Sequence, residues 1–172
     1  MRTLSLSTVK SASLLIPGAD PWHAHPGDPA LSVMTDFRER TSVTVATTAP
    51  IDAALEHMKH TGVRCAFAVD ESQQRVVGLI TAYDILSEKP MHVMQSTGNP
   101  RQEVLVQDLM QRIVEWRVLE VKDVEQATVA QVSRMFEGTR LTHIPVMETT
   151  PQGERRLRGL FSAVRLKRLL GT

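Results

Sequence analysis

A hydroxyl and a carboxylate stand three residues apart in the segment Gly78–Asp84, which reads GLITAYD. The apolar residues before Thr81 predict a strand and those after it predict a helix, so Thr81 and Asp84 would share one face of a helix N-terminus. Backbone N–H groups and the helix dipole favour anions there. Asp84 could accept hydrogen bonds from the cis-diol of a ribose, and Thr81 could contact ribose or phosphate. The open alternative is that Thr81 only caps the helix and Asp84 only complements its dipole.

Two further side chains could contact a phosphate. Arg64 precedes the predicted strand Cys65–Val69, and its guanidinium can bind phosphate through two parallel hydrogen bonds. His143 precedes Ile144–Val146 and could donate a hydrogen bond to the same group. The alternatives are a solvated arginine at a strand edge and a half-buried strand histidine.

A second copy of the motif departs from the first. Gly159–Ser162 keeps the glycine and the hydroxyl, but Arg165 replaces the carboxylate. Because a guanidinium only donates hydrogen bonds, this half-site should not hold a ribose in the same way. Arg165 could instead reach phosphates in the first site, or lie on the surface. The candidate ligand-binding set is Arg64, Thr81, Asp84, His143, Ser162 and Arg165, with no catalytic residues and no metal ligands.

An internal repeat would position these side chains. In each copy a short strand (Val43–Val45; Val118–Val121) precedes a helix with an apolar stripe (Ile51, Ala54, Leu55, Met58; Val129, Val132, Phe136). A hairpin of two strands and a final helix follow. Pairing Val69 with Val146 gives an offset of 77, and pairing Gly78 with Gly159 gives 81. We therefore expect an α/β (α+β) fold of two βαββα units that pack sheet to sheet as pseudo-twofold partners.

The predicted organisation has four parts: an N-terminal arm (1–29), repeat 1 (30–89), a linker (90–103) and repeat 2 (104–172). The arm is expected to be irregular, with one short strand at Leu4–Val9. Each repeat has a lead-in, Leu31–Asp36 or the helical Val104–Ile113, in which Met34 and Met110 correspond. His23 and His25 lie between Asp20 and Asp28; a zinc site is the minor reading and a polar loop the favoured one.

Composition excludes several classes of function. The 172 residues carry a formal charge of +1, so no global field attracts nucleic acid or lipid, and no apolar run is long enough to span a membrane. The single cysteine, Cys65, excludes an internal disulfide and fits a reducing compartment, so we expect a cytoplasmic protein with Cys65 as inert core. The basic run Arg155–Arg158 is interpreted as a solvated hairpin, with nucleic-acid binding a minor option.

These residues resemble CBS domains, which usually occur in tandem as a Bateman module. The resemblance rests on the lead-in with its terminal Met, the βαββα repeat and the complete Gly78–Asp84 motif, and it covers about residues 30–172. Locally, Gly62–Ala66 and the arginine at position 165 are similar to the first module of the AMP-activated protein kinase gamma subunit. The resemblance implies an adenosyl ligand: AMP, ADP or ATP, with NAD or S-adenosylmethionine also possible.

The leading prediction is a regulatory module, not an enzyme, that binds an adenosyl ligand between its repeats and has no cofactor. The alternative is a ligand-free scaffold for dimerisation or protein interaction. Leu86, Leu166, Leu169 and Leu170 on the terminal helices predict a homodimer. A protein partner of unknown identity is expected, and neither a membrane nor nucleic acid.

Overall fold

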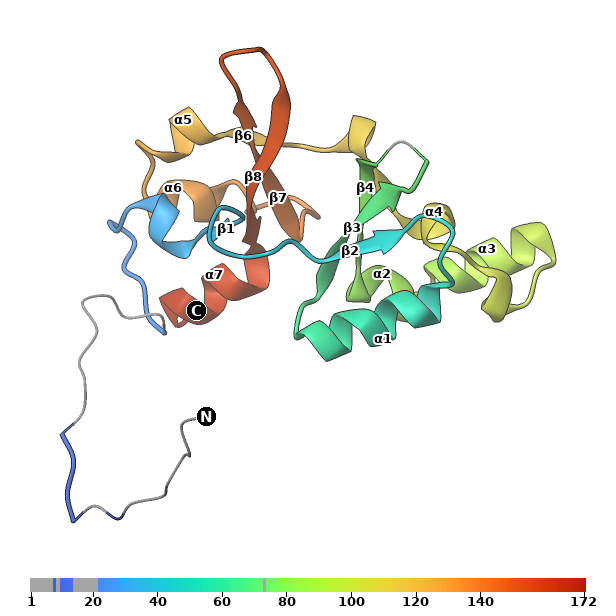
Figure 1. The fold of residues 1–172 in the computed structure, drawn as a ribbon, viewed down its shortest axis with the longest axis horizontal. Coiled ribbons are helices and arrows are strands. Elements are labelled where there is room, and N and C mark those ends of the chain that lie inside the picture. The colour runs from blue at the N-terminus through green and yellow to red at the C-terminus, as the bar shows by residue number, and fades with distance from the viewer. Residues whose placement is uncertain (1–7, 9, 14–21, 73) are drawn as a thin grey trace, which may run out of the picture.

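The chain forms two α/β halves of similar build that lie side by side (Figure 1). The computed structural model describes residues 8, 10–13, 22–72 and 74–172. The predicted strand Leu4–Val9 therefore lies outside the described residues, except for residue 8. The first half contains β2 (Thr44–Ala46), α1 (Ile51–Thr61), β3 (Cys65–Asp70), β4 (Arg75–Thr81) and α2 (Ala82–Leu86). The second half contains β6 (Leu119–Glu120), α5 (Val121–Val124), α6 (Val129–Arg134), β7 (His143–Thr149), β8 (Arg155–Ser162) and α7 (Ala163–Leu170).

The two lead-ins exchange places between the halves. One sheet has the strand order β2-β3-β4-β5, and the other has the order β1-β8-β7-β6. β1 (Thr35–Asp36) precedes the first half but pairs with β8 of the second, and β5 (Gln111–Arg112) precedes the second half but pairs with β4 of the first. Figure 1 shows the early strand β1 among the late elements of the chain. The predicted pair of α/β repeats is confirmed, and each sheet is completed by a strand from the other repeat's lead-in.

The hairpin register corrects one predicted pairing. Ala68 pairs with Gly78 in the first hairpin, and Val146 pairs with Gly159 in the second. The two glycines keep the predicted offset of 81, but the strands before them are offset by 78 rather than 77. The predicted equivalence of Val69 and Val146 is therefore wrong by one residue. Because side chains alternate along a strand, that slip would exchange the two faces of β7.

Local chemistry explains where α1 begins and ends. Pro50 precedes the helix, and Ile51, Ala54, Leu55 and Met58 form its buried stripe as predicted. The helix ends at Gly62, whose φ of 70° lies in the left-handed region that glycine adopts without strain. In the second half, Thr128 caps α6, and its hydroxyl accepts a hydrogen bond from the Gln131 backbone.

The segment between the repeats is more ordered than a linker. It contains helix α3 (Lys89–Thr97), followed by the 3₁₀ helix η2 (Arg101–Glu103). The predicted lead-in helix Val104–Ile113 is shorter: α4 spans Val106–Leu109, and β5 and the 3₁₀ helix η3 (Ile113–Glu115) follow. The first lead-in has the 3₁₀ helix η1 (Ala30–Val33). Likewise, Val121 begins α5 and does not extend the strand before it.

Each half has its own apolar core, and a third cluster joins the two sheets. Buried Cys65, Phe67 and Leu79 of the first sheet pack with partly buried Leu157 and Leu160 of the second. The rings of Phe37 and Phe67 are nearly perpendicular, with a centroid distance of 5.5 Å. The predicted sheet-to-sheet packing is therefore confirmed.

The C-terminal leucines belong to the core of the second half. Leu166 and Leu169 are buried, and Leu170 packs partly buried against them. The prediction that these leucines form a surface patch is wrong, because the apolar face of α7 turns inward. The exposed apolar side chains on the two terminal helices are instead Tyr83 and Leu86 of α2 and Val164 of α7.

Substitution of Gly78 should weaken the pairing of β4 with β5, and substitution of Gly159 should weaken the pairing of β8 with β1. A Cβ at Gly78 would lie 2.7 Å from the Met110 sulfur and 2.8 Å from the Gln111 carbonyl oxygen; at Gly159 it would lie 2.6 Å from the Met34 sulfur and 2.8 Å from the Thr35 carbonyl oxygen. Because the backbone must shift, Gly78→Ala and Gly159→Ala should each destabilise the protein by about 1–3 kcal/mol in urea unfolding.

Gly27→Ala is the matched control, since nothing lies within 4 Å of its Cβ position. Equal stability of all three variants would show that the glycines do not limit the approach of the exchanged strands.

Candidate functional site

A large cleft lies where the two halves meet. It has a volume of about 1160 Å³ and is lined by both halves of the chain. The first half contributes Thr81, Asp84 and Lys89, and the second contributes Arg140–His143. The exchanged lead-in adds Met110 and Gln111. We call this space the Asp84 cleft; a molecule bound in it would touch both repeats at once.

Thr81 and Asp84 form a reciprocal cap at the start of α2. The Thr81 hydroxyl oxygen accepts a hydrogen bond from the Asp84 backbone N–H at 3.1 Å. Oδ2 of Asp84 accepts from the Thr81 backbone N–H at 2.9 Å and from its hydroxyl at 2.6 Å. The capping alternative raised by the sequence is therefore realised in the structure. It engages only one of the two carboxylate oxygens.

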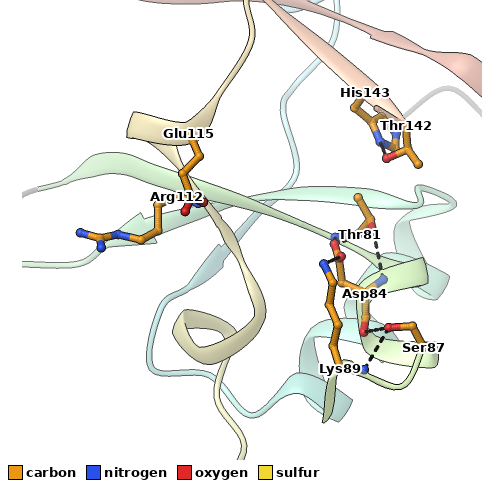
Figure 2. Close-up of polar contacts among 8 residues, drawn as sticks. All are labelled: Thr81, Asp84, Ser87, Lys89, Arg112, Glu115, Thr142 and His143. Atoms are coloured by element: carbon orange, nitrogen blue, oxygen red, sulfur yellow. Dashed lines mark hydrogen bonds and ion pairs between the residues drawn. The ribbon is translucent and has the colours of Figure 1, made fainter. Parts of the chain in front are cut away.

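The second carboxylate oxygen of Asp84 is paired with Lys89, at the beginning of α3 (Figure 2). The Asp84 side chain is only 12% exposed, whereas that of Lys89 is 53% exposed. A nearly buried carboxylate thus lines the cleft, and its second oxygen is paired with a half-exposed lysine side chain.

His143 stands on the opposite wall of the Asp84 cleft. Figure 2 shows His143 and Thr142 across from Thr81, and the Thr142 hydroxyl lies 3.1 Å from Nδ1 of the His143 ring. Burial lowers the pKa of His143 to about 4, against the opposing effect of the Asp84 charge. The ring is therefore uncharged at neutral pH, and any contact with a phosphate would be a hydrogen bond from a neutral donor.

The structure brings together three of the six predicted site residues. Thr81, Asp84 and His143 line the Asp84 cleft, whereas Arg64, Ser162 and Arg165 do not. Arg64 is exposed at the start of β3, and its carbonyl accepts a hydrogen bond from the Ala82 backbone. The corresponding bond in the second half joins Ala163 to Thr142, so Arg64 is the counterpart of Thr142.

The second half-site is occupied by its own arginine. The Ser162 hydroxyl accepts a hydrogen bond from the Arg165 backbone and caps α7. The guanidinium of Arg165 donates to the Thr35 hydroxyl at 3.1 Å. Burial, and then the positive charges of Arg40 and Arg168, lower the pKa of Arg165. The side chain thus turns to the exchanged strand β1 and does not reach the Asp84 cleft.

The basic hairpin is neutralised by acidic partners. Arg155 pairs with Glu120 at 2.7 Å and Arg156 with Glu154 at 2.7 Å. Arg158, predicted to be solvated, is instead buried and lies 2.6 Å from Asp36. This pairing removes the argument for nucleic-acid binding, because each cation already has an anion.

Several residues that line the Asp84 cleft were not predicted from the sequence. Lys89, Arg140 and Glu115 were not among the predicted site residues, since no motif marks them. Each of them lies next to a predicted helix or strand, but the sequence does not show which loops meet in space.

Cys65 was correctly predicted to lie in the core. Burial, and then the charge of Asp84, raise the pKa of its thiol to about 12.

Neither a cluster of metal ligands nor a membrane-spanning helix is found in the described part of the chain. No group of three His, Cys, Asp or Glu side chains is placed there to hold a metal ion, and Asp20 of the predicted polar loop lies outside that part. In the same residues, no helix has the length and apolar character needed to cross a bilayer.

Known proteins share this fold at low sequence identity. Residues 30–90 match the family model of the CBS domain. The CBS-pair protein CBSX2 from Arabidopsis thaliana superposes with a TM-score of 0.53 at 21% identity, covering 83% of this chain and 93% of that chain. CBSX2 is also known in complex with AMP. The CBS-domain protein ATU1752 from Agrobacterium tumefaciens gives a TM-score of 0.57 at 18% identity, over 90% and 96% of the two chains.

Another similar structure is MJ1225 from Methanocaldococcus jannaschii, a proposed archaeal homologue of the AMP-activated protein kinase gamma subunit. Its TM-score is 0.57 at 18% identity, and the match covers 80% of this chain and 48% of that one. No curated protein matches the sequence. Residues 30–90 thus match the CBS-domain model, and the described residues share the fold of these CBS-pair structures.

The environment of His143 predicts a specific loss of stability in acid. An unfolded chain takes up a proton on this histidine near pH 6.5, but the folded protein does so only near pH 4. Lowering the pH through this window therefore favours the unfolded state, by at most about 1.4 kcal/mol per pH unit. Urea unfolding between pH 4 and 7.5 should show a shallower pH dependence for His143→Gln than for the wild type.

His57→Gln is the control, because it removes an imidazole that is exposed on α1 rather than one in the cleft. An identical profile for His143→Gln and the wild type would contradict the assigned environment.

Proposed function

We propose that this protein is a regulatory module that binds an adenine nucleotide or another adenosyl ligand in the Asp84 cleft. One observation carries the proposal: a nearly buried carboxylate at a helix start, with one oxygen not used by the helix cap, lines a cleft of about 1160 Å³ between two CBS-like halves. Such an oxygen can accept a hydrogen bond from a ribose hydroxyl. CBSX2, which has the same fold, binds AMP.

The geometry suggests how binding would be transmitted. The cleft walls come from both halves and from the exchanged lead-in, so a ligand adds contacts across the junction. A ligand that prefers one arrangement of the halves shifts the population toward that arrangement. The surface offered to a protein partner would then depend on ligand concentration. The candidate ligands are AMP, ADP, ATP, NAD and S-adenosylmethionine.

A thermal-shift screen with these five compounds tests the proposal directly. A ligand at 100 times its Kd should stabilise the folded protein by about 2.7 kcal/mol. For the compound that binds best, Asp84→Ala should weaken binding about ten- to a hundredfold in calorimetric titration, because a buried ribose hydroxyl loses its charged acceptor.

Asp108→Ala is the matched control for this loss. Asp108 also caps a helix start, accepting from the Leu105 backbone at 2.8 Å, but it is exposed and does not line the cleft. The Asp108→Ala variant should be less stable than the wild type but should bind the ligand with the same affinity. If none of the five compounds stabilises the wild type, the ligand-free scaffold becomes the better account of the fold.

We also propose that the protein forms a homodimer through α2 and α7. Leu86 is 70% exposed and Val164 is 59% exposed, and Figure 1 shows both helices along the lower side of the molecule. Light scattering at micromolar concentration should report twice the 19.2 kDa chain mass. The double variant Leu86→Glu/Val164→Glu should be monomeric, because two charges cannot be buried unpaired in an apolar contact.

Met135→Glu, at an exposed apolar position on the C-terminal end of α6, should leave the dimer intact. A 19.2 kDa wild type, or a double variant that remains dimeric, would exclude this interface.

A further inference from the structure

Lys89 covers the part of Asp84 that a ligand would need. Oδ2 of Asp84 is engaged by the backbone and hydroxyl of Thr81, and Oδ1 is engaged by the Lys89 ammonium. A ribose hydroxyl approaching from the cleft therefore meets a carboxylate that already has a cationic partner. Binding requires the ammonium to move or to share its acceptor.

Hydrogen bonds hold the backbone of Lys89 in place, whereas its side chain is half exposed to solvent. The Lys89 N–H donates to the Ser87 hydroxyl at 3.3 Å, and that hydroxyl donates to the Asp84 carbonyl at 2.9 Å. The Ser87 N–H donates to the Tyr83 carbonyl at 2.9 Å. This turn joins α2 to α3, while the Lys89 side chain, half exposed, can rotate about its four-carbon stem.

The charges around the cleft give the released ammonium a role. Among the described residues, the lining contains the carboxylates of Asp84, Glu88 and Glu115 and two permanent cations, Lys89 and Arg140. His143 is neutral at physiological pH, as its lowered pKa requires. An anionic ligand therefore depends on Lys89 and Arg140 for charge compensation, and of these Lys89 lies directly beside the proposed ribose acceptor.

We propose that Lys89 makes the Asp84 cleft selective for phosphorylated ligands over the corresponding nucleosides. This inference rests on the proposed function. Without ligand, the ammonium pairs with Asp84. A nucleoside must separate that pair and offers the ammonium no new anion, whereas a nucleotide takes over the carboxylate with its ribose and offers its phosphate to the ammonium. Lys89 thus penalises the first ligand and favours the second.

The test compares AMP with adenosine by calorimetric titration of the full chain. The wild type should bind AMP more tightly than adenosine. In Lys89→Met, adenosine should bind more tightly than it does to the wild type and AMP more weakly, so that the ratio of the two Kd values falls about tenfold. Lys89→Arg keeps the charge and should retain most of the selectivity.

Lys59→Met is the matched control. Lys59 also pairs with a carboxylate, Glu56 at 2.6 Å, but it lies on the exposed face of α1 outside the cleft. It should leave both affinities unchanged. Thermal unfolding of each variant without ligand shows whether the fold is kept.

The outcomes separate the two proposals. If the wild type binds AMP and adenosine but Lys89→Met leaves their ratio unchanged, the role of Lys89 is wrong and the proposed function stands. If adenosine binds only to Lys89→Met, the covering role is supported. If neither ligand binds to the wild type or to Lys89→Met, the role of Lys89 is overturned, and the five-compound screen decides the proposed function.

Discussion

The close approach of each lead-in to the opposite sheet is the contact on which the rest of the structure depends. Met110 and Gln111 lie against Gly78, and Met34 and Thr35 lie against Gly159, at distances that leave no room for a Cβ. Each sheet gains its fourth strand from this contact. Neither half is complete without residues from the other repeat's lead-in, so the halves are held together by backbone hydrogen bonds as well as by apolar packing.

This exchange also builds the Asp84 cleft. The lead-in that supplies β5 carries Met110 and Gln111 into the cleft lining, which also includes the second half's Arg140–His143. A site made in this way is sensitive to the relative position of the halves, which suits the proposed regulatory function. Asp84 has two tasks there, since one of its oxygens holds the helix start and the other faces Lys89.

The pseudo-twofold relation between the repeats is kept in the backbone and broken in the chemistry. The caps at the two final helices match, with Thr81 in one half and Ser162 in the other. Three residues later, one half has a carboxylate and the other has a guanidinium that bonds Thr35. A donor in place of an acceptor changes which ligands the half-site could take, while the helix start itself still forms because the hydroxyl does the capping.

Much of this arrangement can be predicted from the order of residues, because it depends on local periodicity. The apolar stripe of α1, the hairpins whose return strands contain Gly78 and Gly159, and the pairing of Thr81 with Asp84 all involve neighbours along the chain. The one-residue error at Val146 has the same origin, since both registers present apolar residues and only the ladder of hydrogen bonds distinguishes them.

Contacts between distant segments could not be predicted from the order of residues. The burial of Arg158 against Asp36 and the turn of Arg165 toward Thr35 both depend on β1 joining the opposite sheet. The meeting of Asp84 and His143 across one cleft depends on how the halves dock, and the inward face of α7 on the core it covers. Local patterns determine which elements form, whereas packing and charge compensation across the junction decide which side chains meet.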